Sequence, residues 1–207
     1  MRLWIEWILL YVLAPGLLAL LTRGHRSIVL ISIVAGSLVA FALLPRAELT
    51  GGAGKELRPA LLRAALAVIA LFALLAVTGQ WPSFQLVRER PQVFFGVLAL
   101  YPLLSAFPQE ALYRTLFFHR YGALFPTRTS RIAASALVFG WAHVMVHNRL
   151  AMLLAALAGV LLSITWARSR SLWLVGLEHT LYGGCLLATG AGGMFVNGIR
   201  LMSSILR

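Results

Sequence analysis

The sequence contains no aspartate, one lysine (Lys55) and one cysteine (Cys185). A single cysteine cannot form an intramolecular disulfide, so a disulfide-stabilised scaffold is excluded. Charged residues make up 12% of the chain and hydrophobic residues 60%, whereas soluble domains are usually about 45–50% apolar. Mean hydropathy is +0.87, and the apolar segments leave no room for a separate soluble domain. We therefore expect one integral membrane domain over residues 1–207.

Positive charge dominates: the chain has eighteen basic and six acidic residues, and its net charge is +12. The arginines fall mainly between the apolar segments, where they would contact phospholipid headgroups. The chain has no separate basic domain with interleaved aromatic residues, so no nucleic-acid partner is expected. The partner predicted from charge is the phospholipid bilayer. Arginine-rich, lysine-poor usage, rich in alanine and leucine, points to a bacterial chain, so the bacterial inner (plasma) membrane is the expected location.

The apolar segments predict an all-α fold, a polytopic bundle of about seven to eight transmembrane helices. They cover residues 3–21, 28–44, 57–77, 93–118, 132–146, 150–166 and 172–187. Pro102 and Pro108 predict that 93–118 is broken into two helical pieces. The link 78–92 is expected to be a loop or an interfacial amphipathic piece. The tail from Ala188 could hold a partial extra helix.

Two of the six glutamates, Glu110 and Glu178, lie inside strongly apolar stretches. An ionisable group at membrane depth costs about 2.5–3.5 kcal/mol on insertion scales. Each has a basic residue close by, since Arg114 follows Glu110 by four residues and His179 directly follows Glu178. In a helix Glu110 and Arg114 share one face, which fits either a structural ion pair or a catalytic carboxylate. A chain with so few acids makes these two the first candidates for function.

Histidines supply the other polar groups of the predicted spans. His143 lies inside the segment 132–146, and a histidine at such depth usually faces the protein interior. His147, four residues later, lies near the predicted membrane edge and is interpreted as an interfacial residue. Glutamate and histidine together can activate water, and a second histidine can donate to a developing oxyanion. Two histidines and a glutamate could instead hold zinc, although a site without cofactor or metal is favoured.

The motifs Gln109-Glu110-x-x-x-Arg114, Phe139-x-x-x-His143 and His179, in this order on successive spans, resemble those of a known family. This is the CAAX-protease and bacteriocin-processing family of glutamic-type intramembrane endopeptidases, which are related to type II CAAX prenyl proteases. The resemblance covers residues 93–190 and implies a helical membrane fold with a polar catalytic cavity. It implies that a glutamate and His143 activate water, that His179 supports the oxyanion and that Arg114 positions Glu110.

The sequence departs from the family pattern at two positions. Gln109 stands where the family has its first glutamate, and a glutamine side chain cannot act as a general base. Gly183 stands where the family has an asparagine four residues after the third-motif histidine. Either Glu110 takes over the role of base, with Glu178 as a further candidate, or the chain is a non-proteolytic relative. Phe139 and Glu178 are assigned to substrate binding, and Gln109 is expected to line the site.

The predicted function is therefore an intramembrane endopeptidase that hydrolyses a peptide bond of a membrane-associated or C-terminal hydrophobic substrate. The alternative is a non-proteolytic protein of the same fold that binds a membrane peptide or partner, as in bacteriocin immunity or protein sorting. A proton-coupled transporter is a third hypothesis, disfavoured because the chain shows no inverted repeat. The sequence does not identify the substrate, the membrane orientation or the oligomeric state.

Overall fold

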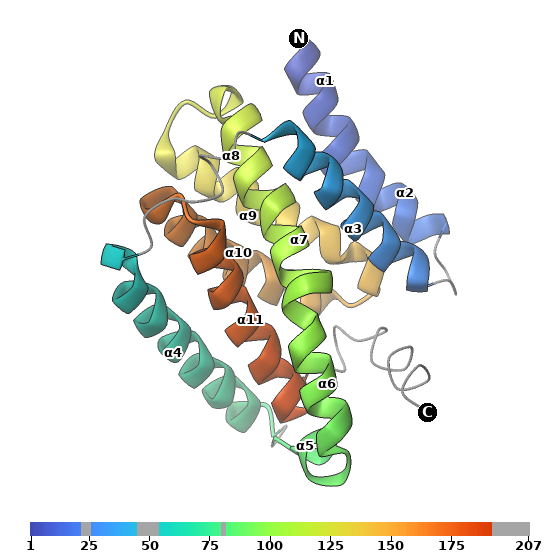
Figure 1. Ribbon diagram of the computed structural model, residues 1–207, viewed down its shortest axis with the longest axis vertical. Coiled ribbons are helices and arrows are strands. Elements are labelled where there is room, and N and C mark those ends of the chain that lie inside the picture. Colours follow the sequence, from blue (N-terminus) through green and yellow to red (C-terminus); the bar gives the residue numbers. More distant parts are fainter. Residues whose placement is uncertain (22–25, 45–53, 80–81, 192–207) are drawn as a thin grey trace.

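The computed structural model describes residues 1–21, 26–44, 54–79 and 82–191, and all regular secondary structure in these ranges is helical. The all-α prediction is confirmed. Figure 1 shows the helices packed side by side along the long axis of the molecule. Predictions about the tail beyond residue 191 lie outside the described residues.

The elements follow the predicted segments closely. The first half contains α1 (Arg2–Ile8), η1 (Leu9–Leu13), α2 (Ala14–Leu21), α3 (Arg26–Leu43), α4 (Gly54–Val77) and α5 (Gln85–Glu89). The second half contains α6 (Pro91–Tyr101), η3 (Pro102–Ala106), α7 (Phe107–Glu110), η4 (Ala111–Leu116), α8 (Phe117–Arg120), η5 (Gly122–Leu124), α9 (Arg128–Ala142), η6 (His143–Val146), α10 (Arg149–Ser169) and α11 (Leu172–Thr189). The link expected at 78–92 contains the short helix α5.

The predicted break in the segment 93–118 is wrong. Residues Pro91–Arg120 form one helix of 30 residues, which is the long green rod of Figure 1. Two stretches of it, η3 and η4, are π-helical. The helix remains continuous because its prolines are accommodated by local widening rather than by a break.

A shared geometry explains how the prolines fit. Inside an α-helix the proline ring clashes with the carbonyl four residues before it. For Pro108 that carbonyl belongs to Leu104, which lies in the π-helical stretch η3. For Pro15 it belongs to Tyr11, which lies in the π-helical stretch η1. In both helices the wider turn is placed where the clash would otherwise occur.

Helices α9 and α10 make the closest helix pair, and two glycines allow their approach. A Cβ added at Gly140 of α9 would lie 2.7 Å from Ala156 Cβ and 2.9 Å from the Met152 carbonyl oxygen of α10. A Cβ at Gly159 of α10 would lie 3.0 Å from Ala136 Cα of α9. Small residues at such crossings let backbones meet at van der Waals distance, which is how membrane helices gain packing energy.

The remaining helices surround the long rod. Helix α11 contacts α10, α4 and the Pro91–Arg120 helix, whereas α3 contacts the rod at α7, η3 and η4. Figure 1 shows α4 on one side of the bundle, with α1 to α3 on the other. Tyr11 of η1 joins the two parts, because its ring contacts Tyr113, Phe117 and Tyr121 and its hydroxyl donates to the Leu112 carbonyl oxygen at 2.8 Å.

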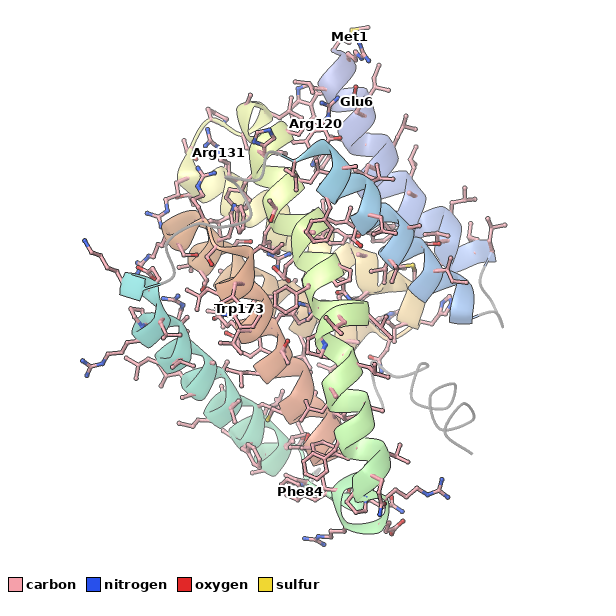
Figure 2. The ribbon with its side chains drawn as sticks, in the orientation of Figure 1. Met1, Glu6, Phe84, Arg120, Arg131 and Trp173 are labelled. Atoms are coloured by element: carbon pink, nitrogen blue, oxygen red, sulfur yellow. The ribbon has the colours of Figure 1, made fainter. Side chains whose placement is uncertain are left out.

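Four helices of the described chain are long and apolar enough to cross a membrane: Arg2–Leu21, Gly54–Val77, Pro91–Arg120 and Arg149–Ser169. Between 17% and 39% of their apolar windows is buried inside the protein. Large apolar side chains such as Leu17, Leu66 and Leu157 are more than half exposed. So much outward-facing apolar surface is typical of lipid contact. Figure 2 places Met1, Glu6, Arg120 and Arg131 at one end of the bundle and Phe84 at the other.

We expect Gly140→Ala to destabilise the protein by about 1–3 kcal/mol, because its new methyl group would overlap α10. The control is Gly16→Ala, whose Cβ would meet Trp141 at an ordinary 3.4 Å. Alanine is favoured over glycine inside a helix by about 0.5–1 kcal/mol, so the control should be neutral or stabilising. Thermal unfolding of the detergent-solubilised variants measures both. Equal melting temperatures for the two variants would contradict the proposed packing.

Candidate active site

The central contact of the candidate site joins Glu110 to His179. Glu110 is the last residue of α7, the α-helical turn between the two π-helical stretches, and His179 lies on α11. Their side chains approach to 2.8 Å between Glu110 Oε1 and His179 Nδ1. The Glu110 side chain is fully buried, whereas His179 is 7% exposed. The carboxylate is therefore shielded from solvent, and its partner His179 retains slight exposure.

Arg114 supplies the opposite charge for this carboxylate. Its Nε lies 3.3 Å from Glu110 Oε2, and both side chains are fully buried. The guanidinium also stacks 4.3 Å from the centre of the Phe139 ring and donates from Nη2 to the Gly159 carbonyl oxygen at 3.5 Å. A buried carboxylate is tolerated when a charge and hydrogen bonds compensate it, which Arg114 and His179 do here.

Residues of all three predicted motifs contact the Phe139 ring. Its centre lies 4.9 Å from that of His143 and 5.6 Å from that of His179, both edge to face. Tyr113 packs against it at 5.4 Å. Phe139 is almost fully buried. The two histidines, which lie on separate elements, and Arg114 therefore all contact one aromatic ring.

Hydrogen bonding indicates the same tautomer for both histidines. Helix α9 tightens at its end, where the His143 backbone N–H bonds to the Gly140 carbonyl oxygen. The Phe139 carbonyl oxygen lies 2.8 Å from His143 Nδ1. A carbonyl only accepts, so His143 Nδ1 carries the proton. A carboxylate oxygen likewise only accepts, so His179 Nδ1–H donates to Glu110 Oε1. In each neutral ring Nε2 is then the basic nitrogen.

Gln109 points along its own helix rather than toward His179. Its Nε2 donates to Ser105 Oγ at 2.8 Å, one turn earlier. Tyr101 lies a further turn back on the same helix. These three polar residues recur at intervals of four and lie on one face of the rod. Neither Tyr101 nor Ser105 was predicted from the sequence, although their spacing from Gln109 was the signal that could have identified them.

Gly183 lies directly against Tyr101. A Cβ built at Gly183 would fall 2.4 Å from both Cζ and the hydroxyl oxygen of Tyr101. No side chain fits there unless the ring moves. The position at which the family resemblance would place an asparagine is thus occupied by a tyrosine from a different helix.

The comparison with known families fits this geometry. Residues 91–185 match the family model described as type II CAAX prenyl endopeptidase Rce1-like. This segment is Rce1-like. The match confirms the resemblance predicted from the motifs and supports the fold of a CAAX-type intramembrane endopeptidase in an integral membrane protein. No match was found among curated proteins or among solved structures.

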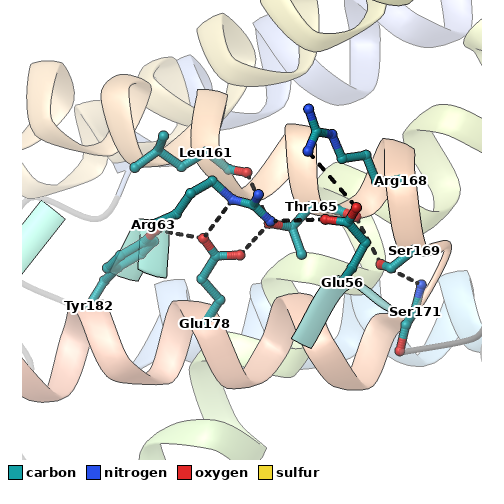
Figure 3. Close-up of polar contacts among 9 residues, drawn as sticks. All are labelled: Glu56, Arg63, Leu161, Thr165, Arg168, Ser169, Ser171, Glu178 and Tyr182. Carbon is teal, nitrogen blue, oxygen red and sulfur yellow. Dashed lines mark hydrogen bonds and ion pairs between the residues drawn. The ribbon is translucent and has the colours of Figure 1, made fainter. Parts of the chain in front are cut away.

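Glu178 also lies in the Rce1-like segment, but it belongs to a separate network (Figure 3). It is 1% exposed and accepts hydrogen bonds from Thr165 Oγ1 and, at 2.6 Å, from the Tyr182 hydroxyl. Arg63 Nε of α4 lies 3.9 Å away. Consecutive helical residues are about 100° apart, so Glu178 and the adjacent His179 face different neighbours.

This second network attaches α4, which lies outside the Rce1-like segment, to α10 and α11. Arg63 donates from Nη2 to Thr165 Oγ1 at 2.8 Å and lies 3.5 Å from Glu56 Oε2. Glu56 in turn lies 3.9 Å from Arg168 Nη1. The contacts explain the burial of Glu178 as a helix-to-helix anchor. Its prediction as a substrate-binding residue remains a prediction.

The predicted residues therefore fall into two groups. The structure brings Glu110, Arg114, Phe139, His143 and His179 together around one ring. Gln109 lies beside this group, directed to Ser105, and Glu178 lies in the network with α4. Within the described ranges no three His, Cys or Glu side chains converge as a metal site would require.

We expect Arg114→Met to cost about 3–5 kcal/mol of stability, because it leaves Glu110 buried beside a single polar partner. The control is Arg120→Met, which breaks the exposed pair with Glu6 seen at the end of the bundle in Figure 2. Water solvates the charges left by that change, so its effect should be far smaller. Chemical unfolding in detergent compares the two. If Arg120→Met lowers the free energy of unfolding as much as Arg114→Met does, the buried Glu110–Arg114 pair is not specially important for stability.

Proposed function

We propose that the protein is an intramembrane endopeptidase that hydrolyses a peptide bond of a membrane-associated or C-terminal hydrophobic substrate. The observation that carries this is the buried Glu110 bonded to the Nδ1 atom of a slightly exposed His179. The Rce1-like match of residues 91–185 supports the reaction class. Composition supports a bacterial plasma membrane as the location.

In this proposal His179 is the general base and Glu110 is its positioning carboxylate. Glu110 accepts from Nδ1–H, which directs the basic Nε2 lone pair away from the carboxylate. Water gives a proton to His179 Nε2 while its oxygen bonds to the scissile carbonyl carbon. The imidazolium that forms is stabilised by the adjacent Glu110, as a carboxylate stabilises a histidine base in other hydrolases. Arg114, whose Nε lies 3.3 Å from Glu110 Oε2, balances the charge of this carboxylate.

The second half of the reaction returns the proton. The tetrahedral intermediate collapses, the C–N bond breaks and His179 Nε2–H protonates the departing amine. His143, which packs against the same Phe139 ring as His179, helps to orient the attacking water. These roles differ from the resemblance-based expectation, in which His143 pairs with the base and His179 supports the oxyanion. The difference rests on the Glu110–His179 contact.

We expect His179→Ala to lower kcat by about 10²–10⁴-fold, the usual contribution of a general base. Glu110→Gln should lower kcat as well, because a glutamine cannot stabilise the imidazolium. The assay uses proteoliposomes, a set of fluorogenic peptides anchored by a hydrophobic C-terminal segment, and mass spectrometry of the products. The matched carboxylate control is Glu6→Gln, in an exposed pair at the end of the bundle.

The control should cleave like the parent. Parent-like cleavage by both Glu110→Gln and His179→Ala would refute the mechanism. Repeating the assay with a chelator and measuring bound metal in the purified protein test the zinc alternative separately.

Gln109→Glu distinguishes a protease from a non-proteolytic relative. Gln109 donates to Ser105 and has no part in the proposed proton transfers, so the parent should cleave without a glutamate at this position. The same proteoliposome assay measures the parent and the variant. Cleavage by the variant alone, with an inactive parent, would show that the chain has lost proteolysis and would favour the binding function.

A further inference from the structure

The proposed reaction needs a hydrogen-bond donor for the oxyanion that develops on the substrate carbonyl. Preorganised donors of this kind supply a large part of the rate enhancement in acyl transfer. His143 Nδ1 and His179 Nδ1 each lie 2.8 Å from an acceptor of the protein, so neither Nδ1–H is available to a substrate oxygen. Arg114 is fully buried against Glu110, and the Gln109 amide donates to Ser105. The predicted site residues thus leave the donor role unfilled.

Tyr101 has the position and the chemistry to fill it. Its ring lies edge to face with His179, with the centroids 6.0 Å apart and the planes at 77°. It is the last residue of α6, directly before the π-helical stretch η3, and its side chain is partly exposed. A phenol is a neutral donor at any pH at which a histidine base operates. The hydroxyl is therefore a donor beside the proposed base.

The close contact with Gly183 shows where this hydroxyl is held. A Cβ at position 183 would lie 2.4 Å from the Tyr101 hydroxyl oxygen. Residue 183 is one helical turn after His179 on α11, so the hydroxyl occupies the space that a side chain on the same face as His179 would otherwise fill. Gly183 leaves room for the Tyr101 ring, and the Tyr101 hydroxyl of α6 is a hydrogen-bond donor on this face of α11.

We propose that Tyr101 is the oxyanion-stabilising residue of this protein. Gly183 leaves room for the Tyr101 ring because it has no side chain. The inference deepens the proposed endopeptidase function and rests on it. The Tyr101 hydroxyl donates a hydrogen bond to the carbonyl oxygen as negative charge develops there, and its proton remains on the tyrosine. Ser105, one turn later on the same helix, accepts a hydrogen bond from Gln109.

The first test removes the hydroxyl and keeps the ring. Tyr101→Phe should lower kcat by about 10²–10³-fold, the cost of one oxyanion donor, with little change in KM. The control is Tyr11→Phe, which also loses one buried hydroxyl, the one that donates to the Leu112 carbonyl oxygen. The control should keep the parental kcat. Thermal unfolding checks that both variants are folded.

The second test moves the donor to α11. Tyr101→Ala vacates the space at Gly183, and the double variant Tyr101→Ala/Gly183→Asn places an amide donor in it. The double variant should recover at least about tenfold in kcat over Tyr101→Ala, because a side-chain amide can replace a hydroxyl as donor. Gly183→Asn alone should destabilise the protein, since the asparagine and the Tyr101 ring cannot both fit.

The outcomes separate this inference from the function on which it rests. If the parent cleaves, His179→Ala is inactive and Tyr101→Phe cleaves like the parent, the role of Tyr101 is overturned while the protease remains. If the double variant Tyr101→Ala/Gly183→Asn has the same kcat as Tyr101→Ala, a donor in this space does not assist the reaction. That result would overturn the assignment. If the parent cleaves none of the anchored peptides, the endopeptidase proposal and this inference fail together.

Discussion

Burial of one carboxylate is the constraint on which the rest of this structure depends. Glu110 has no exposed surface and must be compensated inside the protein. Arg114 from the same helix and His179 from α11 provide that compensation. Removing either partner leaves a buried charge without compensation, which is why the Pro91–Arg120 helix and α11, distant in sequence, are joined at this point. The same contacts fix the tautomer and direction of His179, so the stability of the fold and the preparation of the site share one cause.

Irregular helix geometry makes this arrangement fit. The rod Pro91–Arg120 is π-helical on both sides of the turn that ends with Glu110. Wider turns relieve the proline clash and displace the side chains that follow from ideal α-helical positions. Tyr101 lies just before the first of them. The close α9–α10 packing at Gly140 and Gly159 then holds Phe139 and His143 against the rod.

The two glutamates that are unusual in the sequence have different physical surroundings. Glu110 is bonded to a histidine that retains some exposure, which is the arrangement of a carboxylate acting through an imidazole. Glu178 is bonded to Thr165 and Tyr182 and lies beside Arg63, which is the arrangement of a helix anchor. Both are buried, so burial alone does not separate a reactive carboxylate from a structural one; the identity of the partner does.

Composition and periodicity determined the helical membrane class, because apolar runs of this length are stable only as helices in a bilayer. Local spacing also determined the Glu110–Arg114 pair, since residues four apart meet on any helix. Contacts between segments distant in sequence were decided only by the tertiary structure. The neighbour of Glu110 across the bundle, the direction of Glu178 toward α4 and the place of Tyr101 beside Gly183 all join distant segments. The continuity of the proline-containing rod was decided there too, because π-helical turns leave no simple mark in a sequence pattern.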